Sequence, residues 1–190
     1  ADDTTLGARS AMRKNLSTAA PNSLGGQINI GNTAIGHLED LSKKALDLGN
    51  WDVGIAPLSH GINAVRGLGS TQSAKMEALQ AAAQHYGQEI TKFYAGSPGG
   101  EGERNRFLTA VGAAKTPQEL AAVIQTEAEL AHSRVQALES QIKGTLGDRG
   151  AQQYPVIRPE TQKSMEHIGA NVERLRGGQA AHEASGGDSL

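Results

Sequence analysis

Apolar side chains recur at alternating steps of three and four residues between Ser70 and Tyr94. Such spacing places them on one narrow stripe of an α-helix. A narrow stripe is typical of a helix that lies along another helix, and not of one that covers a sheet. The pattern therefore predicts a helix of about seven turns with this apolar seam: Met76, Leu79, Ala83, Tyr86, Ile90 and Phe93.

Two other stretches show the same spacing. We predict a helix from Asn32 to Leu48, capped by Asn32 or Thr33 and ended by Gly49. A longer helix is predicted from Thr116 to Lys143. Its start has the Thr-Pro-Gln-Glu order of a capping box, with proline at the first helical position. The seam of this helix is long enough to lie antiparallel to that of Ser70–Tyr94, and its residues are Leu120, Ile124, Ala128, Ala131, Val135, Leu138 and Ile142.

Shorter helices and breaks fill the rest of the chain. The shorter helices are expected at Leu6–Leu16, Pro57–Arg66, Glu103–Ala114 and Pro159–Leu175, and Gly87 is expected to mark a close helix crossing or a slight bend. Glycine, proline and small polar residues predict loops at 21–26, around Trp51, at 67–70, at 96–102 and at 144–153. Extended segments are expected at Gln27–Ile30 and at Tyr154–Pro159, where two prolines disfavour helix.

These elements predict an all-α fold. We expect an elongated bundle of five to six helices, with two long antiparallel helices and a disordered C-terminal tail. The corresponding division of the chain is an N-terminal arm at 1–31, a helical domain at 32–176 and a flexible tail at 177–190, which is rich in small and polar residues.

Composition adds that the core is thin. Leu, Ile, Val and Phe together make up 36 of the 190 residues, and alanine supplies much of the remaining apolar content. Because a thin core often needs a partner, we expect a homo-oligomer that associates through its helix seams. The net charge is only −2, so composition gives no basis for sequence-specific nucleic-acid binding. No apolar run is long enough for a stable membrane span. The chain starts with Ala-Asp-Asp and no Met, which suggests a processed or truncated start.

The sequence offers little catalytic or metal-binding chemistry. Cysteine is absent, and the six histidines lie on separate segments without the short spacing of a metal site. The glycines before Ser70 lack the Gly-Lys-Ser/Thr of a phosphate-binding loop. We therefore predict no catalytic, cofactor-binding or metal-binding residues and no enzymatic activity.

The acidic residues of the Thr116–Lys143 helix need one distinction. Glu119, Glu129 and Glu139 fit a solvated helix face with weak intrahelical pairs. Glu127 instead lies beside the seam position Ala128. A partly buried Glu127 has two interpretations: an acid with a raised pKa, or, as we favour, a polar residue that sets the register between helices.

The order of several segments resembles a group of helical proteins encoded by tailed bacteriophages and prophages, mostly short-tailed ones. The similar residues lie between about 31 and 175, and they are Gly31–Leu38, Gln72–Gly96 with its Lys-Phe-Tyr-Ala-Gly end, Thr116–Leu120 with the following helix, and Pro155–Glu160. The resemblance implies a location in the virion and a structural role, as an internal or DNA-ejection component that contacts portal or tail proteins.

Two other functions are compatible with this resemblance. One is an adaptor that docks a helix of another virion protein. The other is the non-catalytic part of a peptidoglycan-cleaving virion enzyme, since some relatives carry a transglycosylase domain on a longer chain. Nothing in this sequence matches the Glu-Ser catalytic segment of that domain, so its activity is not carried over.

Overall fold

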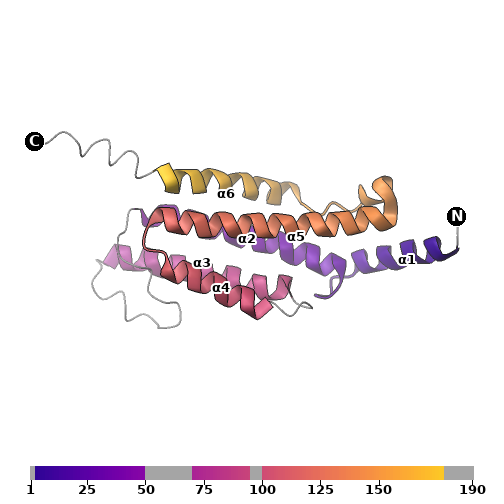
Figure 1. The fold of residues 1–190 in the computed structure, drawn as a ribbon, viewed down its shortest axis with the longest axis horizontal. Helices are drawn as coiled ribbons and strands as arrows, with labels where there is room; N and C mark the ends of the chain where they lie inside the picture. The colour runs from indigo at the N-terminus through magenta and orange to yellow at the C-terminus, as the bar shows by residue number, and fades with distance from the viewer. Residues whose placement is uncertain (1–2, 50–69, 95–99, 178–190) are drawn as a thin grey trace, which may run out of the picture.

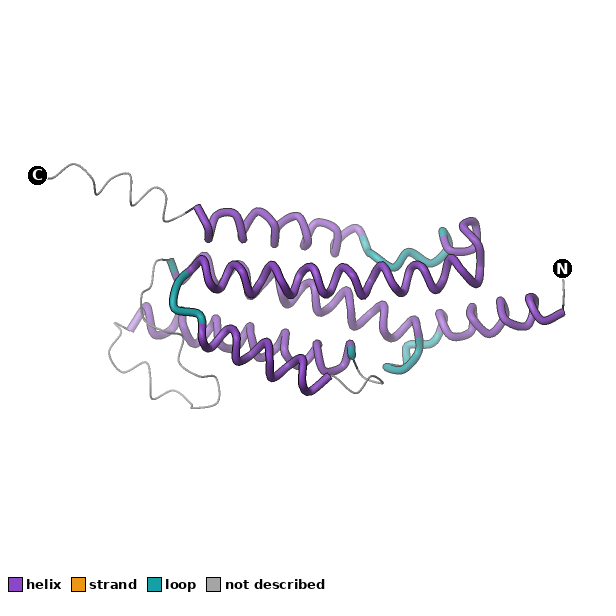
Figure 2. Tube along the Cα trace, in the orientation of Figure 1, coloured by secondary structure: helices purple, strands orange, loops and turns teal. Residues whose placement is uncertain are grey.

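The computed structural model describes residues 3–49, 70–94 and 100–177, and this part of the chain forms six helices and no strand. They make an elongated bundle, which confirms the predicted all-α class (Figures 1 and 2). The helices are α1 (Asp3–Ser17), α2 (Leu24–Leu48), α3 (Ser70–Phe93), α4 (Gly100–Ala113), α5 (Pro117–Ala151) and α6 (Pro159–Gly177).

Helix α2 is the centre of the bundle, because it packs against α3, α5 and α6. Its seam residues Leu38, Leu41 and Ala45 are fully buried. Gly31 allows a close approach of α2 to α3, since a Cβ atom there would lie 2.9 Å from Cε2 of Phe93. The predicted seams of α3 and α5 are also buried within the chain, apart from the partly buried Ala128.

The two longest helices, α2 and α5, run antiparallel (Figure 1). The pairing that we predicted from the sequence, α5 antiparallel to α3, is wrong. Tyr86 meets Glu127 and Phe93 meets Arg134, so contacts advance in the same direction along both helices. Helix α4 lies between α3 and α5 in the chain and runs opposite to both of them (Figure 1). As a result, α3 and α5 are parallel to each other.

The start of α2 differs from the prediction by eight residues. Ser23 is the N-cap, and its hydroxyl accepts a hydrogen bond from the amide of Gly26 at 3.0 Å. The expected loop at 21–26 therefore ends at Ser23, and the expected extended segment Gln27–Ile30 is helical. Gly25 and Gly26 suggested a loop, but they are required by packing: a Cβ atom at Gly26 would lie 1.9 Å from the carbonyl oxygen of Ala20.

The start of α5 confirms the predicted capping box. Thr116 accepts a hydrogen bond from the amide of Glu119 at 3.2 Å, and Glu119 accepts one from the amide of Lys115 at 2.6 Å. The helix continues to Ala151, so the loop predicted from residue 144 is wrong over most of its length. A kink at Gly147, whose φ is 71°, lets the chain turn and then continue as helix.

The remaining boundaries are close to the predictions. Helix α4 includes Gly100–Gly102, which we expected in a connector, and α6 begins at Pro159 as predicted. The segment Tyr154–Arg158 forms bends and not an extended strand. Gly87 lies where α4 crosses α3, with Leu108 about van der Waals distance from the position of a Cβ atom. The predictions for Trp51, Pro57–Arg66 and most of the tail lie outside the described residues.

Candidate functional site

The described histidines do not form a metal site. His37 of α2 and His85 of α3 come together, with ring centroids 6.0 Å apart. In the described ranges no group of three His, Asp or Glu side chains has a geometry that fits a metal ion. Sequence spacing did not reveal this pair because its members lie on different helices. His60 and His182 lie outside the described residues.

Glu127 is buried at the contact of α3, α4 and α5. Its side chain is 7% exposed, and its carboxylate accepts a hydrogen bond from the Tyr86 hydroxyl at 3.3 Å. Burial raises the pKa of Glu127, and the nearby Glu103 carboxylate adds to the rise. The Arg106 guanidinium and the Tyr86 hydrogen bond oppose this shift without cancelling it.

The geometry around Glu127 indicates a structural contact more than a catalytic acid. A general acid has to reach the atom that it protonates. The Glu127 carboxylate instead meets the phenol of Tyr86, which is itself 2% exposed and packs edge-on against Phe107 at 4.9 Å. A polar contact between three helices fixes how they align, in line with the register role that we favoured.

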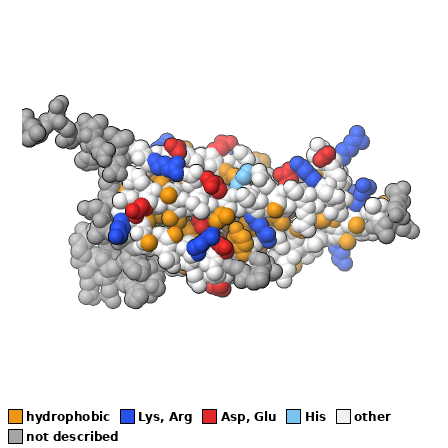
Figure 3. Space-filling model, in the orientation of Figure 1, with side chains coloured by type: hydrophobic (Ala, Val, Ile, Leu, Met, Phe, Trp, Pro, Cys, Tyr) orange, Lys and Arg blue, Asp and Glu red, His pale blue; other side chains and the backbone are white. Residues whose placement is uncertain are grey.

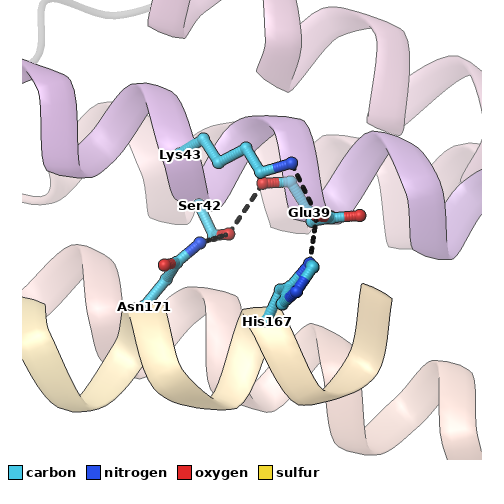
Figure 4. A network of polar contacts seen from close by, with 5 residues as sticks. All are labelled: Glu39, Ser42, Lys43, His167 and Asn171. Carbon is cyan, nitrogen blue, oxygen red and sulfur yellow. Dashed lines mark hydrogen bonds and ion pairs between the residues drawn. The ribbon is translucent and has the colours of Figure 1, made fainter. Parts of the chain in front are cut away.

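A polar cluster lies between α2 and α6 (Figure 4). The Asn171 amide donates to the Ser42 hydroxyl at 2.8 Å, and that hydroxyl donates to the carbonyl oxygen of Glu39 at 2.7 Å. One turn away, the Glu39 carboxylate lies 2.8 Å from Nδ1 of His167 and 2.6 Å from Nζ of Lys43. Polar contacts therefore hold α6 on α2 along much of its length.

Glu39 is the charged centre of this cluster. Its partial burial by itself would raise the pKa of the carboxyl. Hydrogen bonds from Lys43, Ser164 and His167 outweigh that effect, and they lower the pKa of Glu39 to about 2. The carboxylate is thus ionised at neutral pH, and it joins α2 to α6 by charge-assisted hydrogen bonds.

Asn32 forms the other end of the same interface. Its side-chain nitrogen donates to the carbonyl oxygens of Ile28, at 2.7 Å, and Val156, at 2.9 Å. Its oxygen accepts from the amide of Arg158 at 3.1 Å and from the hydroxyl of Thr161 at 2.5 Å. All four hydrogen-bonding positions of the amide are used. Asn32 is therefore the residue that attaches the α5–α6 connection to α2.

Sequence reasoning missed this interface, although a signal was present. Thr161 and Asn171 fall on the stripe that Met165, Ile168 and Leu175 define, at the same steps of three and four. A polar residue on an apolar stripe often makes a buried hydrogen bond. The partner of such a residue is not readable from spacing, because Asn32 and Thr161 are 129 positions apart.

A groove of about 320 Å³ lies between α5 and α6. Its wall is mainly apolar, and His132 contributes a ring whose Nδ1 has no hydrogen-bond partner. On the face in Figure 3, hydrophobic side chains are exposed between charged ones. The groove is lined by Gln125, Ala128, Glu129, His132, Met165, Ile168, Gly169, Val172 and Glu173.

Comparison of the chain with protein-family models, curated proteins and solved structures finds no significant match. Among the helices that the structure describes, none is long and apolar enough to cross a membrane. The function therefore has to be argued from the helices and their surfaces.

Proposed function

We propose that this chain is a non-enzymatic structural protein of a bacteriophage virion, an internal or DNA-ejection component that self-associates. The proposal combines the resemblance of residues 31–175 to such proteins with the elongated helical bundle. The observation that carries most weight is that buried polar side chains contact other helices of the same chain. The buried side chains Asn32, Glu127 and Asn171 all contact another helix, and they support helix alignment more than chemistry on a substrate.

Self-association in this proposal uses a surface other than the apolar seams. Leu79 of α3 and Ile124 of α5 are fully buried by neighbouring helices of the same chain. Association through them would require the bundle to open, at a cost of about 1.5–3 kcal/mol for each large side chain exposed. The groove between α5 and α6 is already accessible, so it is the better surface for association.

The direct test is the composition of purified particles. We expect mass spectrometry of virions produced by a lysogen that encodes the chain to detect it at a fixed copy number. Particles from a strain lacking the gene are expected to adsorb to cells but deliver less DNA. A chain that is absent from washed, intact particles contradicts the proposal.

The groove also supports the second candidate, an adaptor that docks a helix of another virion protein. A mainly apolar groove between two helices is a common site for an amphipathic helix. Cross-linking within intact particles separates the two candidates. Self-association gives links between copies of this chain, whereas an adaptor gives links from α5 or α6 to a different protein.

The third candidate is the non-catalytic part of a peptidoglycan-cleaving enzyme. We expect purified chain and its Glu127→Gln variant to leave peptidoglycan intact in a digestion assay. Turnover by the wild type that the variant loses would contradict a non-enzymatic role.

A further inference from the structure

Helix α1 carries an exposed surface that the rest of the bundle leaves uncovered. Its C-terminal end is fixed, since Leu16 is buried and the Asn15 side chain accepts a hydrogen bond from the amide of Leu24 at 2.9 Å. Its N-terminal part extends beyond the end of the bundle (Figure 1). Leu6, 53% exposed, is the one large hydrophobic side chain so exposed among the described residues.

The exposed leucine lies on a basic helix face. Leu6, Arg9 and Arg13 follow at positions i, i+3 and i+7, so they share one side of α1. Neither arginine forms an ion pair with another described residue. This face of α1, which we call the arm face, combines an apolar side chain with two cationic ones.

The groove between α5 and α6 has the complementary character. Ala128, Met165, Ile168 and Val172 make its apolar wall. Two carboxylates stand at its margin: Glu129, and Glu173, which also pairs with Arg176 at 3.3 Å. Glu129 forms no ion pair with another described residue, and its carboxylate accepts a hydrogen bond from Gln125 at 2.8 Å. At Gly169 a Cβ atom would meet nothing within 4 Å, so backbone and side chains leave this part of the groove open.

We propose that the arm face of one copy docks in the α5–α6 groove of a second copy. Leu6 enters beside Gly169, and Arg9 and Arg13 face Glu129 and Glu173. The charges favour this arrangement, because opposite potentials across an interface set its register and speed its formation. The occupant is therefore a second copy of this chain.

The positions of the two surfaces make the contact head-to-tail. Helix α1 projects from one end of the bundle, whereas the parts of α5 and α6 that line the groove, at 125–132 and 165–173, lie toward the other end (Figure 1). A contact between different surfaces leaves one arm and one groove free on every dimer. Such heterologous contacts continue into rings or open chains. This inference rests on the proposed self-association and names the surface that performs it.

The test is sedimentation velocity of the full chain over a range of concentrations. We expect the wild type to associate, and association to weaken by about 0.5 M salt, because the charges at the contact are exposed. Arg9→Glu with Arg13→Glu removes the arm charges, and Gly169→Trp fills the groove. Each variant should weaken self-association roughly tenfold or more, since rim charges and pocket filling both act on this contact.

Two matched controls keep the result specific. Lys75→Glu with Lys163→Glu makes the same change in net charge at exposed sites outside both surfaces. Gly169→Ala adds a methyl group where there is space. Both controls should associate like the wild type, and circular dichroism should give the same helix content for all variants.

Mixing the two defective variants gives the decisive outcome. The arm variant keeps a groove and the groove variant keeps an arm, so the mixture should form a 1:1 complex that grows no further. A wild type that stays monomeric, or variants that associate normally, would overturn the proposal. So would a monomeric chain whose groove binds a different virion protein. A chain found in particles but monomeric in solution overturns only the docking, whereas absence from particles overturns the proposed function.

Discussion

The hydroxyl of Thr161 donates a hydrogen bond to the side-chain oxygen of Asn32 across 2.5 Å, joining the first turn of α6 to α2. The same Asn32 side chain holds the carbonyl of Val156 and the amide of Arg158. One buried amide thus fixes both the connection that follows α5 and the helix that it leads into. The position of α6, and with it the α5–α6 groove, depends on this residue.

Asn32→Ala should strongly destabilise the protein. The substitution leaves the buried carbonyl of Val156, the amide of Arg158 and the hydroxyl of Thr161 without their partner, and each unsatisfied buried group costs about 1–3 kcal/mol. We expect a loss of roughly 3 kcal/mol in the free energy of unfolding, measured by urea denaturation. Asn105→Ala is the control, because Asn105 is exposed on α4. Equal effects of the two substitutions would contradict the role of Asn32.

Glu127→Gln should stabilise the protein at neutral pH. Because burial raises the pKa of Glu127 above its unfolded value, the folded state binds the proton more tightly than the unfolded state. Wild-type stability therefore falls as pH rises from below 4.5 through the raised pKa, and the neutral glutamine avoids this loss. Denaturation at several pH values should show an advantage of the variant at pH 7 that disappears in acid.

The exposed Glu77 of α3 provides the comparison for Glu127. Glu77→Gln removes a carboxylate from solvent and should change the free energy of unfolding little at either pH. A Glu127→Gln variant that is less stable than the wild type at pH 7 would mean that the ionised carboxylate contributes favourably to the fold.

Glu39 should have the opposite pH dependence. Its pKa is lowered from 4.5 to about 2, so its contribution to stability is complete above the unfolded value and is lost as pH falls toward 2. Glu39→Gln should cost about 1–2 kcal/mol at pH 7, after allowance for solvent screening of the group. Its denaturation profile should be flatter in acid than that of the wild type. Exposed Glu77 of α3, changed to glutamine, is the control; a Glu39→Gln profile as steep as the wild type contradicts this assignment.

Substitution of alanine for two glycines near the end of α5 should have opposite effects on the stability of the protein. Gly144 lies in regular helix with nothing within 4 Å of a Cβ atom, so Gly144→Ala should stabilise by up to about 1 kcal/mol. Gly147 has φ 71° and ψ 169°, a region that is almost exclusive to glycine, and Gly147→Ala should destabilise by about 1–3 kcal/mol. Thermal unfolding of both variants measures the difference, and an equal response would show that the kink at Gly147 is not needed.

Local patterns in the sequence determined the helices. The seams of α3 and α5, the capping box at Thr116 and the start of α6 at Pro159 are readable because helix periodicity and end signals involve residues a few positions apart. At the start of α2 the local signal misled because of a contact with the segment that immediately precedes the helix. Gly25 and Gly26 suggested a loop, yet they allow α2 to begin against the carbonyls of Thr18 and Ala20.

Only the tertiary structure decided how the helices are arranged. The parallel course of α3 and α5, the buried Tyr86–Glu127 contact and the three long-range bonds of Asn32 depend on which elements meet in space. Thin seams with similar spacing can pair in several orders, since apolar burial has no direction of its own. Hydrogen bonds do have direction, and the matching of buried polar groups between α2 and α6 favours one placement of α6 on α2.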